Sequence, residues 1–210
     1  MLSGLQKKVL LFVSRSILSK KFYFTGGTAL TVFYLHHRDS EDLDFFSEQE
    51  VELSDLRPFL AWSRRQQCLV DWEVKGPRRM ALIHRGREKL KVDFSYYPFP
   101  RVERGFCWNK LSVDSEKDIA VNKIQAMATR LESKDFIDFF VMMKRHSHWR
   151  VEELRRLTRI KFDVNLHPYA LGEKFLQVDQ LRDFPVMHEP FDPKEFRAFF
   201  LQAAADLAKK

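Results

Sequence analysis

The chain has 210 residues, of which 45% are hydrophobic and 31% charged, and its net charge is +7. This composition excludes a disordered chain, and the two cysteines, which lack CxxC spacing, indicate free thiols in a reducing compartment. The length allows one large domain or two small ones, and the basic balance favours a polyanionic partner such as RNA, DNA or an acidic protein.

The first 21 residues predict an amphipathic helix rather than a targeting or membrane segment. Polar residues at 14–16 interrupt the apolar run, which is too short to span a membrane and lacks a small-residue cleavage site. We therefore expect a cytoplasmic protein with no membrane partner. The residues predicted to face inward are Leu5, Val9, Phe12 and Val13.

The stretch 22–47 carries the strongest chemical signal in the sequence. A strand-like run at 22–24 leads into Gly26, Gly27 and Thr28, and helical spacing of apolar residues follows. Glycine lets the backbone approach a ligand closely, and the unpaired N–H groups at a helix N-terminus bind anions. The strand, the glycine turn and the helix together therefore predict a phosphate site.

A second strand follows, with Asp42 and Asp44 two residues apart. Residues at this spacing face the same side of a strand, so Leu43 and Phe45 are expected in the core. Mg²⁺ is held by one or two carboxylates together with substrate phosphates. A Gly-Gly pair alone is usually a turn, and Asp-x-Asp alone is usually a solvated strand edge. Their order here favours the functional interpretation.

The pattern resembles the nucleotidyltransferase superfamily related to DNA polymerase β. More narrowly, GGTAL at 26–30 and the R-x-S-x-D-L-D-F-F string at 38–46 resemble the AbiEii/AbiGii toxin family. This resemblance implies nucleotide contacts, metal ligands and catalytic groups. The implied nucleotide-binding residues are Gly26, Gly27, Thr28, Arg38, Ser40 and Lys123; the metal ligands are Asp42, Asp44 and Asp93; and the catalytic residues are these three aspartates with Lys123 and Asp135.

Three strand-like runs between residues 68 and 96 are separated by turns at Gly76-Pro77 and Gly86, which predicts an antiparallel meander. The third run, 88–96, alternates, so Asp93 is expected on a polar face of the sheet. The resemblance places the third metal-binding carboxylate there, whereas an ordinary exposed strand aspartate is the alternative.

The period then becomes helical over 115–132, with Lys123 and Arg130 at the margin of an apolar stripe. A lysine in such a place faces solvent by default. The resemblance implies instead a lysine on this helix whose ammonium meets the nucleotide phosphates, and that role is carried to Lys123. Arg130 also fits the family pattern, without an assigned role.

A further helix is predicted to follow Ser133 as its cap, and Ser54 is predicted to cap an earlier helix over 55–67. The KDFID string at 134–138 resembles the family's late acidic motif, in which Asp135 lies near the active site and Asp138 is the weaker candidate. Acidic residues in a first helical turn are also favourable with the helix dipole.

We therefore expect an α+β fold, with a mixed or antiparallel nucleotidyltransferase-type sheet flanked by helices and followed by a C-terminal helical region. The predicted domains are an α/β core at 1–113 and a helical region at 114–210. The C-terminal part is predicted to contain helices at 151–161, from 168 to about 181, and from 193 to 208.

The resemblance implies an Mg²⁺-dependent toxin of a toxin–antitoxin or phage-defence system, with Mn²⁺ as an alternative ion. It would transfer a nucleoside monophosphate from an NTP to an acceptor hydroxyl, with a tRNA 3′ end as the favoured acceptor and an antitoxin protein as partner. Two alternatives stay open at this point: an Mg-nucleotide-binding module without transfer activity, and a basic nucleic-acid-binding protein.

Overall fold

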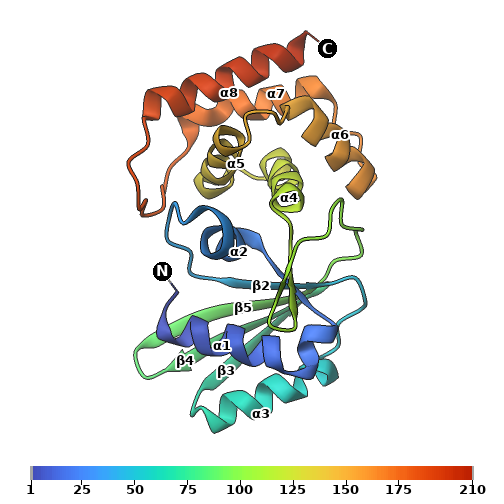
Figure 1. Ribbon diagram of the computed structural model, residues 1–210, viewed down its shortest axis with the longest axis vertical. Helices are drawn as coiled ribbons and strands as arrows, with labels where there is room; N and C mark the ends of the chain where they lie inside the picture. The colour runs from blue at the N-terminus through green and yellow to red at the C-terminus, as the bar shows by residue number, and fades with distance from the viewer. Residues whose placement is uncertain (1, 210) are drawn as a thin grey trace. The chain divides into compact units, whose positions relative to one another are not determined.

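The computed structural model describes residues 2–209, which form two compact units (Figure 1). The sheet unit comprises the residues up to 34, 40–100 and 104–115. The helical unit comprises residues 35–39, 101–103 and the chain from 116 onward.

The sheet unit is built on a mixed seven-stranded sheet in the order β3-β4-β5-β2-β1-β7-β6. The pairs β2/β5 and β1/β7 are parallel, and the other neighbours are antiparallel. The expected α+β class is confirmed. The strands are β1 (Tyr23–Thr25), β2 (Leu43–Ser47), β3 (Leu69–Lys75), β4 (Arg78–Arg85), β5 (Glu88–Tyr96), β6 (Cys107–Trp108) and β7 (Leu111–Val113).

The predicted meander β3-β4-β5 is confirmed, and its two turns have a simple cause. Lys75 pairs with Arg78 and Arg85 pairs with Glu88, so each hairpin loop has two residues. Each loop begins with a glycine at positive φ, 54° for Gly76 and 59° for Gly86. Two-residue hairpins favour this backbone conformation, which glycine adopts without steric cost.

One face of the sheet forms the core of this unit. Leu43 and Phe45 of β2 lie beside Val92 and Phe94 of β5, and all four are fully buried. The Phe59 ring contacts the Phe94 ring with centroids 5.1 Å apart. The helices of this unit are α1 (Gly4–Arg15), α2 (Gly26–Leu30) and α3 (Arg57–Arg65), with 3-10 turns at Ile17–Lys20 and Leu53–Leu56 and a π-helical turn at Thr31–Leu35.

The helical unit contains α4 (Glu116–Thr129), α5 (Ser133–Arg145), α6 (Val151–Phe162), α7 (Pro168–Leu176), the 3-10 turn Gln177–Gln180 and α8 (Pro193–Ala208). Its core is aromatic. The Phe136 ring of α5 lies 4.9 Å from that of Phe200 on α8, and the Phe175 ring of α7 lies 5.2 Å from Phe200. Three helices therefore share one cluster of phenylalanines.

Two predicted helix caps are wrong. Ser54 lies inside the 3-10 turn, where Glu52 and Asp55 form a capping box, and α3 begins only at Arg57. Ser133 is the first residue of α5 rather than its cap. Its hydroxyl donates to the carbonyl of Asp183 at 2.8 Å, so a tertiary contact uses the group that was expected to cap the helix.

Between residues 2 and 209, no helix combines the length and the apolar composition that crossing a membrane requires.

Candidate active site

The central feature of the sheet unit is a row of polar residues across three adjacent strands. Asp93 of β5 is the register partner of Asp44 of β2, and Asp44 is the register partner of Thr25 of β1. Register partners project from the same face of a sheet. This face is opposite the one that carries Leu43 and Phe45. The two carboxylates are therefore neighbours because of strand pairing.

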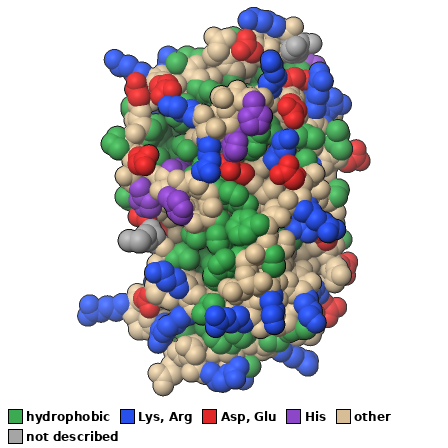
Figure 2. All heavy atoms as spheres, viewed as in Figure 1, with side chains coloured by type: hydrophobic (Ala, Val, Ile, Leu, Met, Phe, Trp, Pro, Cys, Tyr) green, Lys and Arg blue, Asp and Glu red, His purple; other side chains and the backbone are tan. Residues whose placement is uncertain are grey.

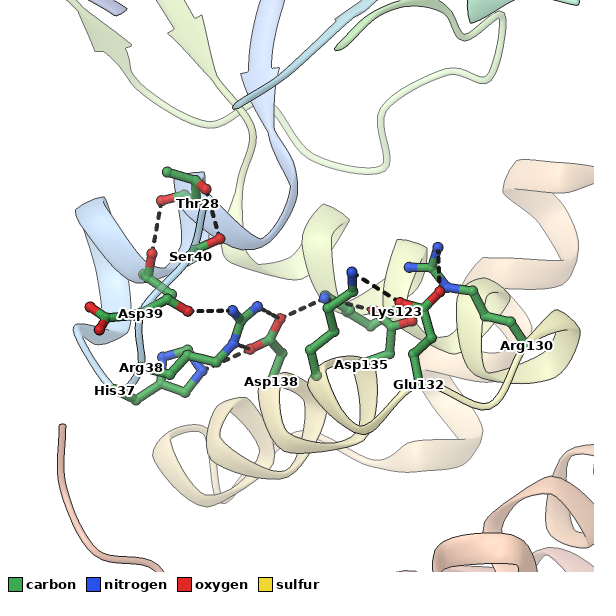
Figure 3. A network of polar contacts seen from close by, with 12 residues as sticks. Thr28, His37, Arg38, Asp39, Ser40, Lys123, Arg130, Glu132, Asp135 and Asp138 are labelled. Atoms are coloured by element: carbon green, nitrogen blue, oxygen red, sulfur yellow. Dashed lines mark hydrogen bonds and ion pairs between the residues drawn. The ribbon is translucent and has the colours of Figure 1, made fainter. Parts of the chain in front are cut away.

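Asp42 lies just outside the strand that was predicted to contain it. β2 begins at Leu43, and the Asp42 carbonyl accepts a hydrogen bond from the Thr28 hydroxyl. The hydroxyl oxygens of Thr28 and Ser40 are 2.7 Å apart (Figure 3). Gln6 of α1 donates to the carbonyls of Ser40 and Glu41, at 2.9 Å each. Helices α1 and α2 thus fix the segment that enters β2.

The glycine turn is packed directly against Asp44. Gly26 has φ +76°, and a Cβ atom at this position would lie 2.2 Å from Oδ2 of Asp44. Only glycine satisfies both the backbone conformation and the close approach. Gly27 follows in α2, and Thr28 is buried with 1% of its surface exposed. The predicted contacts of these residues with phosphate remain predictions.

Two of the three predicted metal ligands, Asp93 and Asp42, form ion pairs with basic side chains of the protein. Nε of Arg78 donates to Oδ2 of Asp93 at 2.8 Å, and Nη2 bonds the same oxygen. The Ser95 hydroxyl donates to Oδ1 of Asp93 at 2.5 Å. Asp42 forms an ion pair with Lys91. The face of β5 that carries Asp93 is polar, as expected, but Asp93 is only 1% exposed.

A further carboxylate beside this polar row, Asp114, was not predicted. It follows β7, whose Val113 pairs with Phe24, so it lies beside Thr25. The Thr25 hydroxyl donates to Oδ2 of Asp114 at 2.8 Å, and the Tyr34 hydroxyl donates to its carbonyl at 2.8 Å. No local pattern signals this residue, because the parallel pairing of β1 with β7 joins segments far apart in the chain.

The helical unit holds the other predicted site residues in a second cluster (Figure 3). Nζ of Lys123 on α4 lies 2.8 Å from Oδ1 of Asp135 and 2.5 Å from Oδ2 of Asp138, both on α5. Arg130 donates from Nε to the other oxygen of Asp135 at 2.8 Å. Lys123 is therefore buried between two carboxylates rather than placed at the margin of its helix, and its predicted contact with phosphates stays a prediction.

Asp138, the weaker candidate in the sequence, is the centre of this cluster. It is fully buried, and its Oδ1 accepts from Nε of Arg38 at 2.6 Å and lies 2.8 Å from Nε2 of His37. Nη2 of Arg38 donates to Oδ2 at 2.8 Å. The predicted nucleotide contact Arg38 is only 4% exposed, because its guanidinium is held by this carboxylate.

The charges of the cluster shift the pKa values of its members so that the ionised forms are favoured. Burial alone would raise the pKa of Asp138, but Lys123 and Arg38 outweigh burial and hold that pKa far below its usual range. The pKa of Asp135 is lowered in the same way, with burial opposed by Lys123 and Arg130. Burial would lower the pKa of Lys123, and Asp138 and Asp135 raise it instead. Asp135, Asp138 and Lys123 are therefore ionised at neutral pH.

The carboxylates of the sheet unit suit a divalent metal by their chemistry. Oxygen donors are those that Mg²⁺ and Mn²⁺ prefer, and Asp44 and Asp93 are neighbours across the sheet. Within residues 2–209, no three His, Cys, Asp or Glu side chains already surround a common metal position. Arg78 and Lys91 instead supply the positive charge next to Asp93 and Asp42.

Residues 9–207 match the family model for the nucleotidyl transferase AbiEii toxin, Type IV TA system. The chain belongs to this family. A protein of Aquifex aeolicus (strain VF5), the uncharacterized protein aq_aa25, is 33% identical over 147 residues, which cover 67% of this chain and 66% of that protein. The chain thus spans just under two thirds of the length of this relative.

Two solved structures share the fold of this AbiEii family member. JHP933 from Helicobacter pylori is 18% identical with a TM-score of 0.57, and the likeness covers 100% of this chain and 94% of that one. A putative nucleotidyltransferase from H. pylori is 17% identical with a TM-score of 0.60, and the likeness covers 99% and 96%. Both likenesses extend over the sheet unit and the helical unit.

Proposed function

We propose that this AbiEii family member transfers a nucleoside monophosphate from an NTP to an acceptor hydroxyl and releases pyrophosphate. The observation that carries the proposal is the pairing of Asp44 with Asp93 directly beside the Gly26 turn. Carboxylates that can hold metal ions lie there next to a turn whose glycine lets a triphosphate approach the backbone.

Asp42, Asp44 and Asp93 would hold Mg²⁺, with Mn²⁺ as an alternative. A bound pair of such ions would neutralise the triphosphate and lower the pKa of the attacking hydroxyl. The turn Gly26–Thr28 would bind phosphate oxygens through backbone N–H groups. Phosphoryl chemistry depends chiefly on positioning and charge, so this set needs no covalent nucleophile.

The remaining predicted residues act on position and charge. Ser40 and Arg38 are proposed to contact the nucleotide, and the bonds of Ser40 with Thr28 and of Arg38 with Asp138 would hold both in place. Lys123 is proposed to add positive charge for the phosphates, and Asp135 to orient its ammonium. The Arg38–Asp138 and Lys123–Asp135 pairs hold buried charges in a fixed geometry, which is what electrostatic stabilisation of a transition state requires.

We favour RNA, and a tRNA 3′ end in particular, as the acceptor. The net charge of +7 suits a polyanion. Lys and Arg side chains gather over the part of the surface where Figure 1 draws α1 and α3 (Figure 2). The exposed basic residues of these two helices are Lys7, Lys8, Arg15, Arg57, Arg64 and Arg65. Family membership further supports a role as the toxin of a toxin–antitoxin or phage-defence system with a protein antitoxin.

Label transfer tests this proposal. The purified chain is incubated with Mg²⁺, total tRNA and each NTP in turn, labelled at the α-phosphate. We expect label on RNA with one NTP, none with Asp42→Asn/Asp44→Asn, and wild-type labelling with Glu50→Gln, which removes an exposed carboxylate of the same unit. Label on a protein band would keep the chemistry and change the acceptor. No label with any acceptor would favour a nucleotide-binding module.

A further inference from the structure

Arg78 and Lys91 form ion pairs with two of the carboxylates that are proposed to bind the metal, Asp93 and Asp42. Both oxygens of Asp93 already accept hydrogen bonds, because Oδ2 takes two N–H groups of Arg78 and Oδ1 takes the Ser95 hydroxyl. Asp42 is paired with Lys91. A divalent metal binds through oxygen lone pairs, so it must compete with both side chains.

The side chains of Arg78 and Lys91 are exposed enough to rotate away from the carboxylates into solvent. The side chains of Arg78 and Lys91 are 50% and 36% exposed, whereas that of Asp93 is 2% exposed. Both cations sit on long flexible stems whose charged ends reach solvent, and the Lys91–Asp42 pair, which is partly exposed on both sides, is weak in water. Rotation into solvent would free Asp93 and Asp42 without moving the strands, because Asp93 is held by the register of β5 and the Asp42 backbone by its bond with Thr28.

In the absence of metal, the two cations offset the repulsion among the carboxylates of the site. Asp42, Asp44 and Asp93 are all carboxylates, Asp44 and Asp93 are register partners, and charges of the same sign repel one another. Arg78 comes from β4 and Lys91 from β5, both next to this cluster, and each pairs with one member of it. They supply the positive charge that a metal would otherwise provide.

We propose that Arg78 and Lys91 are resident counter-ions of the metal site, which a divalent metal displaces when it binds. The inference rests on the proposed function, since it assigns the metal to Asp42 and Asp93. It adds that metal binding and release of two protein cations are one coupled step. Once released, both cations stand beside a site that receives a polyanionic substrate.

Direct binding of Mn²⁺, followed by loss of the free-ion electron paramagnetic resonance signal, tests this inference without measuring activity. Arg78→Gln and Lys91→Gln should each bind Mn²⁺ about two- to fivefold more tightly than the wild type, the range expected for removing a weak competing ion pair. Lys89→Gln is the matched control, because Lys89 is an exposed lysine of the same strand and the same face as Lys91. It removes the same charge and should have a clearly smaller effect.

The outcomes separate the inference from the proposed function. One result would overturn the inference alone. In it, Asp42→Asn and Asp93→Asn weaken Mn²⁺ binding, but Arg78→Gln and Lys91→Gln bind Mn²⁺ no more tightly than Lys89→Gln does. A wild-type chain that binds no Mn²⁺ in the absence of nucleotide would overturn the inference, and label transfer would decide the proposed function separately. Should Arg78→Gln fail to fold, Arg78→Lys keeps the charge but loses the two-pronged bond to Oδ2, and it should still tighten binding.

Discussion

Oδ2 of Asp44 lies 2.2 Å from the place that a Cβ atom on Gly26 would occupy. The glycine turn and the acidic strand are thus a single packed unit, in which the backbone at Gly26 shapes the surroundings of the carboxylate. A side chain at position 26 would therefore displace the Asp44 carboxylate, to which the proposed chemistry assigns a metal-binding role.

Gly26→Ala should abolish nucleotidyl transfer, with a loss of at least about 100-fold, the size expected when reacting groups are displaced by about 1 Å. The matched control is Gly86→Ala. Gly86 also has positive φ, 59°, but a Cβ atom added there would meet nothing within 4 Å. It should lose about 1 kcal/mol of stability and no activity. Equal activity losses in the two variants would show that the contact with Asp44 has no role.

Asp138→Asn should destabilise the chain by about 3–5 kcal/mol, because it leaves Arg38 and Lys123 buried without their shared carboxylate. Urea unfolding followed by circular dichroism measures this. Asp179→Asn is the comparison, since the Asp179–Arg197 pair is exposed and its loss should be undetectable. A stable Asp138→Asn variant would mean that the cluster does not hold the helical unit together.

The pH dependence of stability should carry the signature of Asp135 and Asp138. Both have pKa values lowered in the folded state. Such groups stabilise the fold above the unfolded pKa of about 3.9, and this stability is lost as pH falls through the folded pKa. The gap in unfolding free energy between the wild type and Asp138→Asn should be constant above about pH 5 and should shrink below about pH 4. A gap that widened on acidification would contradict the ionised cluster.

Thr25→Val should cost about 1–3 kcal/mol, because Oδ2 of the buried Asp114 loses the hydroxyl that donates to it. Thr25→Ser keeps that hydroxyl and should retain most of the stability. Thermal unfolding of the three proteins separates these cases. A valine variant as stable as the wild type would show that the hydroxyl bond to Asp114 contributes nothing, and a loss in the serine variant alone would assign the effect to the methyl group and its packing.

Local patterns in the sequence predicted much of the fold. Strand-like runs identified β3, β4 and β5, the last by its alternation; glycines marked their turns, and Pro193 marked the start of α8. The strand position of Asp44 and its orientation away from the core also followed from period two. The cap predictions at Ser54 and Ser133 failed because a capping box at Glu52 and a tertiary bond to Asp183 took over these positions.

Long-range contacts in the candidate site could not be read from the sequence. The pairing of Asp44 with Asp93 depends on a parallel register between segments about fifty residues apart, and the bond of Thr25 to Asp114 depends on another. No local pattern signals the bond of Arg78 to Asp93. The burial of Lys123 depends on α5 meeting α4, which helical periodicity does not reveal.

The transfer of a nucleoside monophosphate with release of pyrophosphate is tested most directly by following the α- and γ-phosphates of the NTP in parallel reactions. The chain, Mg²⁺ and tRNA are incubated with the active NTP labelled at either the α- or the γ-phosphate. We expect the α-label to join the acceptor and the γ-label to leave as pyrophosphate, and we expect Asp93→Asn to remove both signals. Transfer of γ-label to the acceptor, or release of inorganic phosphate in place of pyrophosphate, would contradict this expectation.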